Sequence, residues 1–194
     1  MGLWRKMLIE DIPYVYNIAT DIWTTHKESQ IIYENKFCSF PEGCYVYDDN
    51  GIKGYIISHP YNLSSPPKIN TLLPNVEINC LFIHDIVIVT EYRGRGIGNE
   101  IINKILDNNP FSGETDTQCA CVREADNEVV STENHRSPTL APDFFPIVSL
   151  VACDDKTKDF WIGYGFEVVE TSDCDYGIYM VKNIGKKSGA TKGL

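Results

Sequence analysis

Apolar positions recur along several stretches of the chain at spacings of three and four residues, which predicts amphipathic helices. In the first stretch, Asp11 stands where a helix cap is expected, and the apolar side chains that follow it share one helical face. In the last stretch, Gly165 follows the final periodic residue, as glycine commonly does where a helix ends. The predicted helices are Asp11–Trp23, Lys27–Lys36, Ile97–Leu106 and Asp155–Tyr164.

Short apolar or alternating runs around these helices predict β-strands. Asp49-Asn50-Gly51 joins two such runs and is a strong hairpin signal. The run Cys80–Val89 is apolar except at His84 and Asp85, as expected of a strand buried on both faces. The predicted strands are Cys44–Asp48, Ile52–His59, Cys80–Val89, Pro146–Cys153, Phe166–Glu170 and Tyr176–Lys182, with one more ahead of the first helix. This order of elements predicts an α/β (α+β) fold around a mixed central sheet.

The length of 194 residues suits a single domain with its own core, which we expect to span residues 1–184. Residues 111–143 interrupt this domain with a polar stretch that holds seven acidic and two basic residues. That composition predicts an acidic insertion exposed to solvent. Residues 185–194 are rich in glycine and lysine and are expected to form a disordered tail.

Charge and cysteine content narrow the classes of function. With 17 basic against 27 acidic residues the net charge is −10, which argues against nucleic acid as a partner. No apolar stretch approaches the ~20 residues of a membrane span, so no membrane partner is expected. The seven cysteines are scattered and no secretion signal is evident, which predicts reduced thiols in the cytoplasm or the nucleus. Cys119, Cys121 and His135 do not have zinc spacing, and no metal site is expected.

The stretch with the clearest chemical signal runs from Val89 to Asn99, where a predicted strand gives way to a helix. Three glycines at alternate positions let the backbone approach a ligand closely, and N–H groups at a helix start favour phosphate oxygens. Arg93 and Arg95 add positive charge, so a pyrophosphate is the expected ligand. The residues after Gly98 do not fit a P-loop, and Asn99 stands where a dinucleotide fingerprint needs glycine.

The pattern Arg93-x-x-Gly96-x-Gly98 resembles the pyrophosphate-binding motif of the GNAT superfamily of N-acetyltransferases. Three other stretches resemble that family in the same order along the chain: Gly54–Pro60, Leu81–Ile88 and Phe160–Glu167. The resemblance implies a mixed sheet of six to seven strands flanked by about four helices, in which the fourth and fifth strands splay apart.

The resemblance also implies where acetyl-CoA would bind. Backbone groups of Ile86, Val87 and Ile88 would pair with the pantetheine arm, and an N–H near Ile88 would face the thioester oxygen. The pyrophosphate would lie against Arg93 and the N–H groups of the loop, which belong to Gly94, Arg95, Gly96, Ile97, Gly98 and Asn99. Asp154 stands where the family usually has a cofactor-contacting asparagine, and Trp161 is expected to pack against the pantetheine or the core.

Two residues are candidates for proton transfer. The resemblance implies that His84 is the base, directly or through water, whereas a structural role, paired with Asp85 or a backbone carbonyl, is the alternative. The family's usual acid is a tyrosine, but Trp161 occupies that position and indole cannot supply a proton. Tyr164 is the candidate substitute, with a core aromatic as the alternative. Cys153 is expected to be a buried structural thiol, and His59 a surface or capping residue.

These features together predict an acetyl-CoA-dependent N-acetyltransferase whose acceptor is a primary amine on a small molecule, a polyamine or a protein. The negative charge favours a cationic acceptor, which the acidic insertion could attract. Two alternatives stay open: a catalytically inactive acyl-CoA-binding regulatory module, and a nucleotide-binding protein that uses residues 93–99. A monomer or a homodimer is expected.

Overall fold

The computed structural model describes residues 2–108, 145–170 and 174–185. The predicted insertion at 111–143 lies outside the described residues, and so does the predicted tail at 185–194 except for Gly185.

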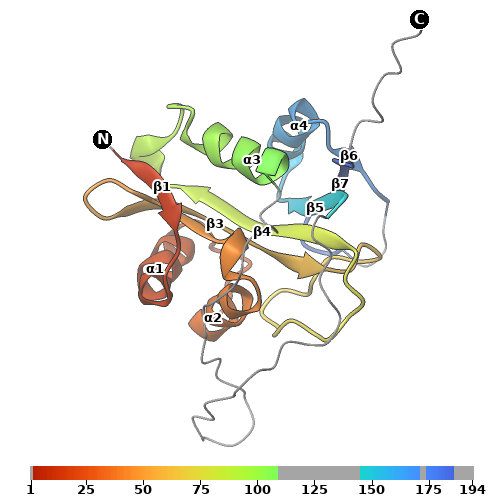
Figure 1. The fold of residues 1–194 in the computed structure, drawn as a ribbon, viewed down its shortest axis with the longest axis horizontal. Coiled ribbons are helices and arrows are strands. Elements are labelled where there is room, and N and C mark those ends of the chain that lie inside the picture. The colour runs from red at the N-terminus through yellow and green to blue at the C-terminus, as the bar shows by residue number, and fades with distance from the viewer. Residues whose placement is uncertain (1, 109–144, 171–173, 186–194) are drawn as a thin grey trace, which may run out of the picture.

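A seven-stranded mixed sheet forms the centre of the described part of the chain, with the strand order β1-β2-β3-β4-β5-β7-β6 (Figure 1). All neighbouring strands run antiparallel except β4 and β5, which are parallel. The strands are β1 (Leu3–Lys6), β2 (Tyr45–Asp48), β3 (Ile52–Tyr61), β4 (Cys80–Ile88), β5 (Ile147–Ala152), β6 (Glu167–Val168) and β7 (Ile178–Asn183). The predicted α/β class and mixed sheet are confirmed.

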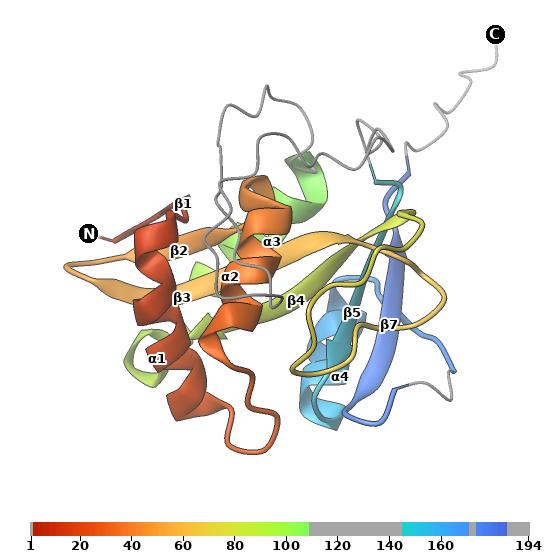
Figure 2. The same cartoon turned by 90° about the horizontal axis from the view of Figure 1, so that it is seen from below.

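Four α-helices in the described residues cover the two faces of this sheet. The helices are α1 (Ile12–Ile22), α2 (Gln30–Ser39), α3 (Ile97–Asn108) and α4 (Asp155–Gly163). Helices α1 and α2 lie on one face, and α3 and α4 lie on the other (Figures 1 and 2). Within the described ranges, three short 3-10 helices connect these elements: Ile9–Asp11, Pro41–Gly43 and Thr90–Tyr92.

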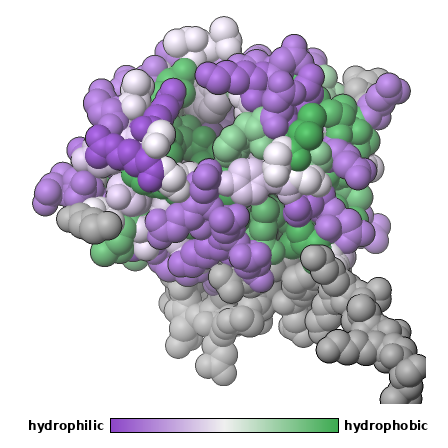
Figure 3. Space-filling view, turned by 90° about the horizontal axis from the view of Figure 1, so that it is seen from above, coloured by the Kyte–Doolittle hydropathy of each residue, from purple (hydrophilic) through white to green (hydrophobic). Residues whose placement is uncertain are grey.

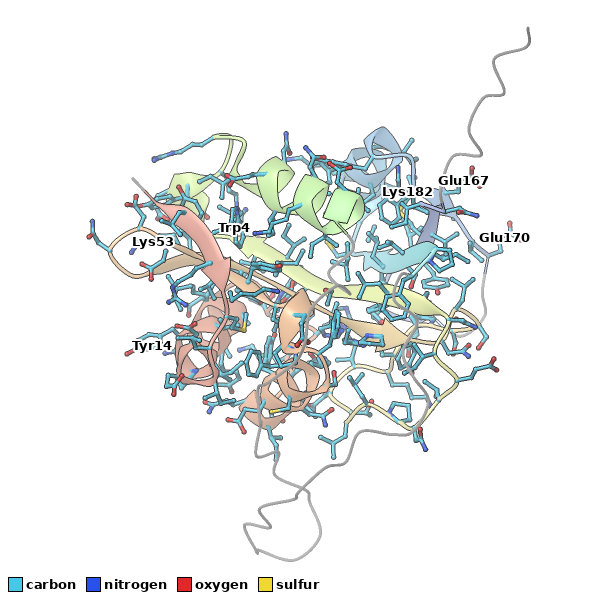
Figure 4. All side chains as sticks on the ribbon, in the orientation of Figure 1. Trp4, Tyr14, Lys53, Glu167, Glu170 and Lys182 are labelled. Atoms are coloured by element: carbon cyan, nitrogen blue, oxygen red, sulfur yellow. The ribbon has the colours of Figure 1, made fainter. Side chains whose placement is uncertain are left out.

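Alternation along the strands divides the core between the two helical layers. Tyr55 and Ile57 of β3 pack with α1 and α2, whereas Ile56 between them packs with α3. Trp4 of β1 joins the α3 side and donates its indole N–H to the carbonyl of Ile97 at 3.0 Å, which fixes the start of α3 (Figure 4). From the side of α3 and α4, hydrophobic surface shows among hydrophilic side chains (Figure 3).

Strands β4 and β5 diverge as the predicted fold requires. Their pairing covers only Leu81, Phe82 and Ile83 of β4, and Ile83 faces Leu150 in the last pair. Strand β4 continues to Ile88 with β3 as its neighbour. The edge of β4 beyond Ile83 is therefore left without a β5 partner.

A bulge in β4 places its two polar residues on the same face. Ile57 pairs with Asp85 and Ser58 pairs with Ile83, so His84 is the extra residue. Ile83 and Ile86 both pack on the α3 side. His84 and Asp85 consequently both point toward α1 and α2, where each finds its partners.

Two local expectations need correction. Helix α1 begins after Asp11, but the Asp11 side chain does not cap it and accepts hydrogen bonds from Arg5 and from the Leu8 N–H instead. Helix α2 begins at Gln30, directly after Ser29 and three residues later than predicted. The hairpin prediction is confirmed, since Asn50 and Gly51 both have positive φ between β2 and β3.

Candidate active site

Strand β4 leads into an exposed loop that carries the three alternating glycines. Gly94 and Gly96 have φ angles of +75° and +80°, which glycine adopts without strain. A Cβ atom added at Gly94, Gly96 or Gly98 would meet nothing within 4 Å. The first N–H groups of α3 have no carbonyl partner within the helix, so the loop presents an open backbone suited to an anion.

The two arginines of the loop are exposed but anchored. Arg93 donates from Nε to the carbonyl of Ile88 at 2.8 Å. Arg95 donates to the carbonyl of Glu91 at 2.7 Å, and its guanidinium lies 4.8 Å from the ring centre of Tyr92. Both side chains therefore hold positive charge at the loop without an acidic partner among these contacts.

A cavity of about 120 Å³ lies where β4 and β5 separate. Both faces of β4 contribute to it, through Ile83 and Ile86 on one face and His84 and Asp85 on the other. The wall on the side of β5 and α4 includes Leu150, Val151, Cys153, Thr157 and Trp161. The opposite wall includes Trp23, His26, Glu28, Tyr33, Ile69 and Tyr176. The cavity thus joins the two layers of the fold through the gap in the sheet.

Three buried polar side chains meet beside the cavity, and two of them, Glu28 and His84, line it. His84 Nε2 lies 2.9 Å from Glu28 Oε2 and 2.5 Å from Lys36 Nζ, and Lys36 Nζ lies 2.5 Å from Glu28 Oε2. The other Glu28 oxygen accepts the backbone N–H of Asn70 at 2.8 Å. The Lys36 side chain has an exposed fraction of 0% and that of Glu28 only 4%. The second ring nitrogen of His84, Nδ1, is buried without a partner.

Asp85 ties β4 to the helical layer beneath it. Its Oδ2 accepts a hydrogen bond from Trp23 Nε1 at 3.0 Å and another from the Tyr55 hydroxyl. Trp23 directly follows α1, and Tyr55 belongs to β3. Asp85 therefore positions part of the cavity wall rather than pairing with His84.

Burial and neighbouring charges shift the protonation of these groups. Burial lowers the pKa of Lys36 to about 8, although the Glu28 carboxylate opposes this shift. Burial, together with the charge of Lys36, also lowers the pKa of His84, so the imidazole is neutral at pH 7. Burial alone would raise the pKa of Glu28, but His84 and Lys36 lower it below its usual range. Burial raises the pKa of Asp85 to about 6.

Comparison with known families identifies the scaffold. A profile of the Acetyltransferase (GNAT) family matches residues 12–108, which are half of the chain and include β4 and the glycine loop. The chain belongs to the GNAT family. A search among curated proteins finds no match.

Solved structures share the GNAT fold over nearly their whole length. Ard1 from Thermoplasma volcanium aligns with a TM-score of 0.61 at 18% identity, covering 95% of this chain and 99% of that one. The ribosomal-protein-S18-alanine N-acetyltransferase from Escherichia coli gives 0.58 at 13% identity, with 97% of each chain covered. Diaminobutyrate acetyltransferase EctA from Paenibacillus lautus, solved with its substrate and coenzyme A, gives 0.59 at 10% identity, covering 97% and 99%. At these identities the likeness shows the fold alone.

The residues predicted for this GNAT site lie on β4 and on or directly before α4. Ile86 lines the cavity, and Val87 and Ile88 continue β4 toward the glycine loop. Trp161 is buried, packs against Phe166 and also lines the cavity. Asp154 caps α4 by accepting the N–H of Thr157 at 2.7 Å. The hypotheses for these residues as cofactor contacts remain predictions.

Tyr164 is not among the residues that line the cavity. It follows the last residue of α4, is half-buried and packs against Phe160 and Trp161. Its carbonyl accepts a hydrogen bond from Lys182. This placement does not support Tyr164 as a general acid and agrees better with the alternative of an aromatic packed against the core.

Two further expectations are wrong. Cys153 is exposed and lines the cavity, with its Sγ 3.3 Å from Thr157 Oγ1, so it is not a buried structural thiol. His59 is fully buried in β3, where its Nδ1 lies 3.1 Å from the carbonyl of Pro60 and Nε2 lacks a partner. A histidine at an inward position of a predicted strand was the available signal for this burial.

Sequence reasoning missed Glu28 and Lys36 as parts of the site. Glu28 precedes α2 and Lys36 lies within it, and both are far from His84 in the sequence. Only the packing of α2 on the sheet brings the three side chains together. One signal was present: Lys36 shares the buried stripe of α2 with Ile32, Tyr33 and Phe37. A lysine in an apolar stripe needs a buried partner.

The described part of the chain contains five cysteines. Cys44, Cys80, Cys153 and Cys174 are free thiols, but Cys38 is disulfide-bonded, so the prediction of reduced thiols throughout is wrong there. No group of His, Cys, Asp and Glu in the described residues could hold a metal ion. None of the described helices has the length and apolar character needed to cross a bilayer.

Proposed function

We propose that this GNAT protein transfers the acetyl group of acetyl-CoA to a primary amine. The observation that carries the proposal is a buried, neutral imidazole with an unpartnered nitrogen, placed on the strand that connects the cavity to the glycine loop. A base beside a cavity and an anion site on the same strand are the two parts that this reaction needs.

The residues present fit acetyl-CoA as the co-substrate. The open space at Gly94, Gly96 and Gly98 would accommodate the pyrophosphate, held by the loop N–H groups and by Arg93 and Arg95. The edge of β4 left by β5 would offer the backbone of Ile86, Val87 and Ile88 to the pantetheine arm. When bound, acetyl-CoA supplies an activated acyl carbon as a thioester.

The protein's own task is to prepare the amine. An alkyl ammonium has a pKa of roughly 10.4 and must lose a proton before it can attack. His84 is neutral and lines the cavity, so it accepts this proton directly or through water. The carboxylates of Glu28 and Asp85 and the aromatic rings of Trp23, Tyr33 and Tyr176 suit a cationic acceptor.

The acceptor is proposed only as a primary amine. The neighbours named above include an enzyme for the alanine of a ribosomal protein and one for diaminobutyrate. Both kinds of amine therefore belong in a test panel for this chain. Nothing among the comparisons favours the inactive acyl-CoA-binding module.

A thermal-shift titration with acetyl-CoA, CoA, ATP and NAD tests the proposal first, followed by a panel of amines with detection of free CoA thiol. A ligand at about 100 times its Kd stabilises by roughly 2.7 kcal/mol, a shift of several degrees. Stabilisation by acetyl-CoA and CoA together with turnover of an amine is the expected result.

The other outcomes separate the alternatives. Stabilisation by acetyl-CoA without turnover of any amine would indicate the inactive binding module, and equal stabilisation by ATP or NAD would indicate a nucleotide-binding protein. No shift with acetyl-CoA or CoA would overturn the proposed function.

A further inference from the structure

The contact between Lys36 and His84 has no part in the chemistry described so far. Lys36 Nζ lies 2.5 Å from His84 Nε2, which is hydrogen-bonding distance between two nitrogens, in a place closed to solvent. Glu28 Oε2 lies 2.9 Å from the same His84 nitrogen. His84 Nε2 can accept from Lys36 or donate to Glu28, but it cannot do both at once.

The charge of Lys36 decides between these two arrangements. A charged ammonium donates to Nε2, so the proton of the neutral ring sits on Nδ1 and the ring has no lone pair left there. A neutral Lys36 allows Nε2 to carry the proton and to donate it to Glu28 or to the Lys36 amine. Nδ1, which has no protein partner, then has a free lone pair.

We propose that Lys36 selects the tautomer of His84 and stores, through His84, the proton that the acceptor amine loses. This inference rests on the acetyltransferase function proposed above. Lys36 is thus a positioning residue, and Glu28 holds the ammonium that forms on it.

The proton transfer balances within these groups. An N–H bond of the acceptor ammonium breaks as Nδ1–H forms, while Nε2–H breaks as an N–H bond forms on the neutral Lys36 amine. Forming the amide removes two protons from the acceptor nitrogen. One returns from Lys36 through His84 to the thiolate of coenzyme A, and the other leaves to water.

The protonation tendencies of the groups agree with this geometry. The pKa of Lys36, about 8, lies above the lowered pKa of His84, so Lys36 is the better store for the proton. It also lies near the ~8.5 of a thiol, so the return transfer is nearly balanced. The relay would supply the proton that Trp161, in the place of the family's tyrosine, cannot give.

Other titratable groups surround the pair. Asp85 adjoins His84 on β4, His59 faces it from β3 with ring centres 5.8 Å apart, and Tyr33 faces Lys36 from α2. Burial raises the pKa of Asp85 only to about 6, lowers that of His59 and raises that of Tyr33. Three more titratable groups lie nearby: Tyr55 and Tyr176, whose pKa values are raised, and His26.

Nitrogen NMR of the full ¹⁵N-labelled protein tests the tautomer without any need for turnover. The chain has only four histidines, and the His84→Gln spectrum assigns the signals of His84. From about pH 6.5 to about pH 9.5, the proton of His84 should move from Nδ1 to Nε2 with a midpoint near the Lys36 pKa of about 8. A single tautomer across this range would overturn the proposal.

Lys36→Met gives the matched comparison, since Glu28 then keeps His84 and the Asn70 N–H as partners. We expect Nε2–H at every pH in this variant, and a wild-type spectrum in it would also overturn the proposal. Lys104→Met, at an exposed position of α3 across the sheet, should titrate like the wild type. The wild-type titration decides the matter alone if Lys36→Met does not fold.

Kinetics test the storage of the proton. In Lys36→Met the maximal kcat should fall roughly 10- to 30-fold, and the acid limb of the kcat profile should no longer follow the Lys36 pKa of about 8. An unchanged profile would overturn the relay. Absence of turnover with every amine would instead contradict the proposed function and leave the NMR result in place.

Discussion

At the scale of single residues, Glu28 and Lys36 bury opposite charges next to His84. Removing one member of a buried pair typically costs roughly 3–5 kcal/mol, because the other charge is left uncompensated. Here His84 and the Asn70 N–H remain bonded to Glu28 when Lys36 becomes apolar. The loss of Lys36 should therefore affect proton transfer more than folding.

Replacing His84 by glutamine should lower kcat by roughly 10²- to 10⁴-fold, because glutamine cannot accept a proton. A base works only when unprotonated, so activity falls as pH drops through the pKa of the coupled His84–Lys36 pair. His84→Gln should lose this acid limb. The checks are the kcat profile against pH and the Kd for CoA, which should not change.

Tyr164→Phe is the companion variant, since Tyr164 lies off the cavity. It should keep nearly all of its activity. A wild-type pH profile in His84→Gln would return His84 to a structural role, and a large loss in Tyr164→Phe would restore Tyr164 as the acid.

At the scale of elements, regular hydrophobic patterns predicted most boundaries to within a few residues. The β2–β3 hairpin followed from Asn50-Gly51, and β4 followed from its apolar run. Helix α2 begins three residues later than predicted, and its buried stripe includes Lys36, which a search for apolar positions does not reveal. The bulge at His84 could not be predicted, since it depends on the register between β3 and β4. The sign of the bulge in the sequence is the pair of adjacent polar residues, His84 and Asp85, within an apolar run.

Gly96→Glu should weaken CoA binding by roughly 100-fold or more, because a carboxylate would stand where the loop favours phosphate. The space around Gly96 is open, so the fold should survive with some strain from its positive φ. Calorimetric titration with CoA measures the loss, and circular dichroism checks the fold.

Two variants separate charge from strain in this experiment. Gly96→Ala carries the strain of positive φ without the charge, and Gly163→Glu adds the same charge on α4 in open space. Both should bind CoA more tightly than Gly96→Glu. Equal affinity of Gly96→Glu and the wild type would remove the loop from the cofactor site.

At the scale of the whole molecule, the site is assembled from segments far apart in the chain. Glu28 precedes α2, Lys36 lies within it, His84 comes from β4 and Trp161 from α4. The order of elements and the glycine loop were predictable because each is local. The meeting of Glu28 and Lys36 with His84 was not, because it arises from packing a helix on one face of the sheet.

Asp85 makes the stability of the whole fold depend on pH. Burial raises its pKa from 3.8 to about 6, so the folded state favours the protonated form. The stabilising contribution of protonated Asp85 is fully present below pH 3.8 and is lost as pH rises through about 6. A shift of this size corresponds to roughly 3 kcal/mol in the free energy of unfolding.

Asp85→Asn removes this titration, because asparagine stays neutral while its amide oxygen can still accept from Tyr55 or Trp23. The difference in Tm, variant minus wild type, should therefore rise between about pH 4 and pH 7 by roughly 5–10 °C. Any constant loss from imperfect hydrogen bonding shifts the difference equally at every pH. Calorimetry across this range measures it, with Asp21→Asn on the exposed side of α1 as the control. A pH-independent difference for Asp85→Asn would show that Asp85 is ionised in the fold as readily as in the unfolded chain.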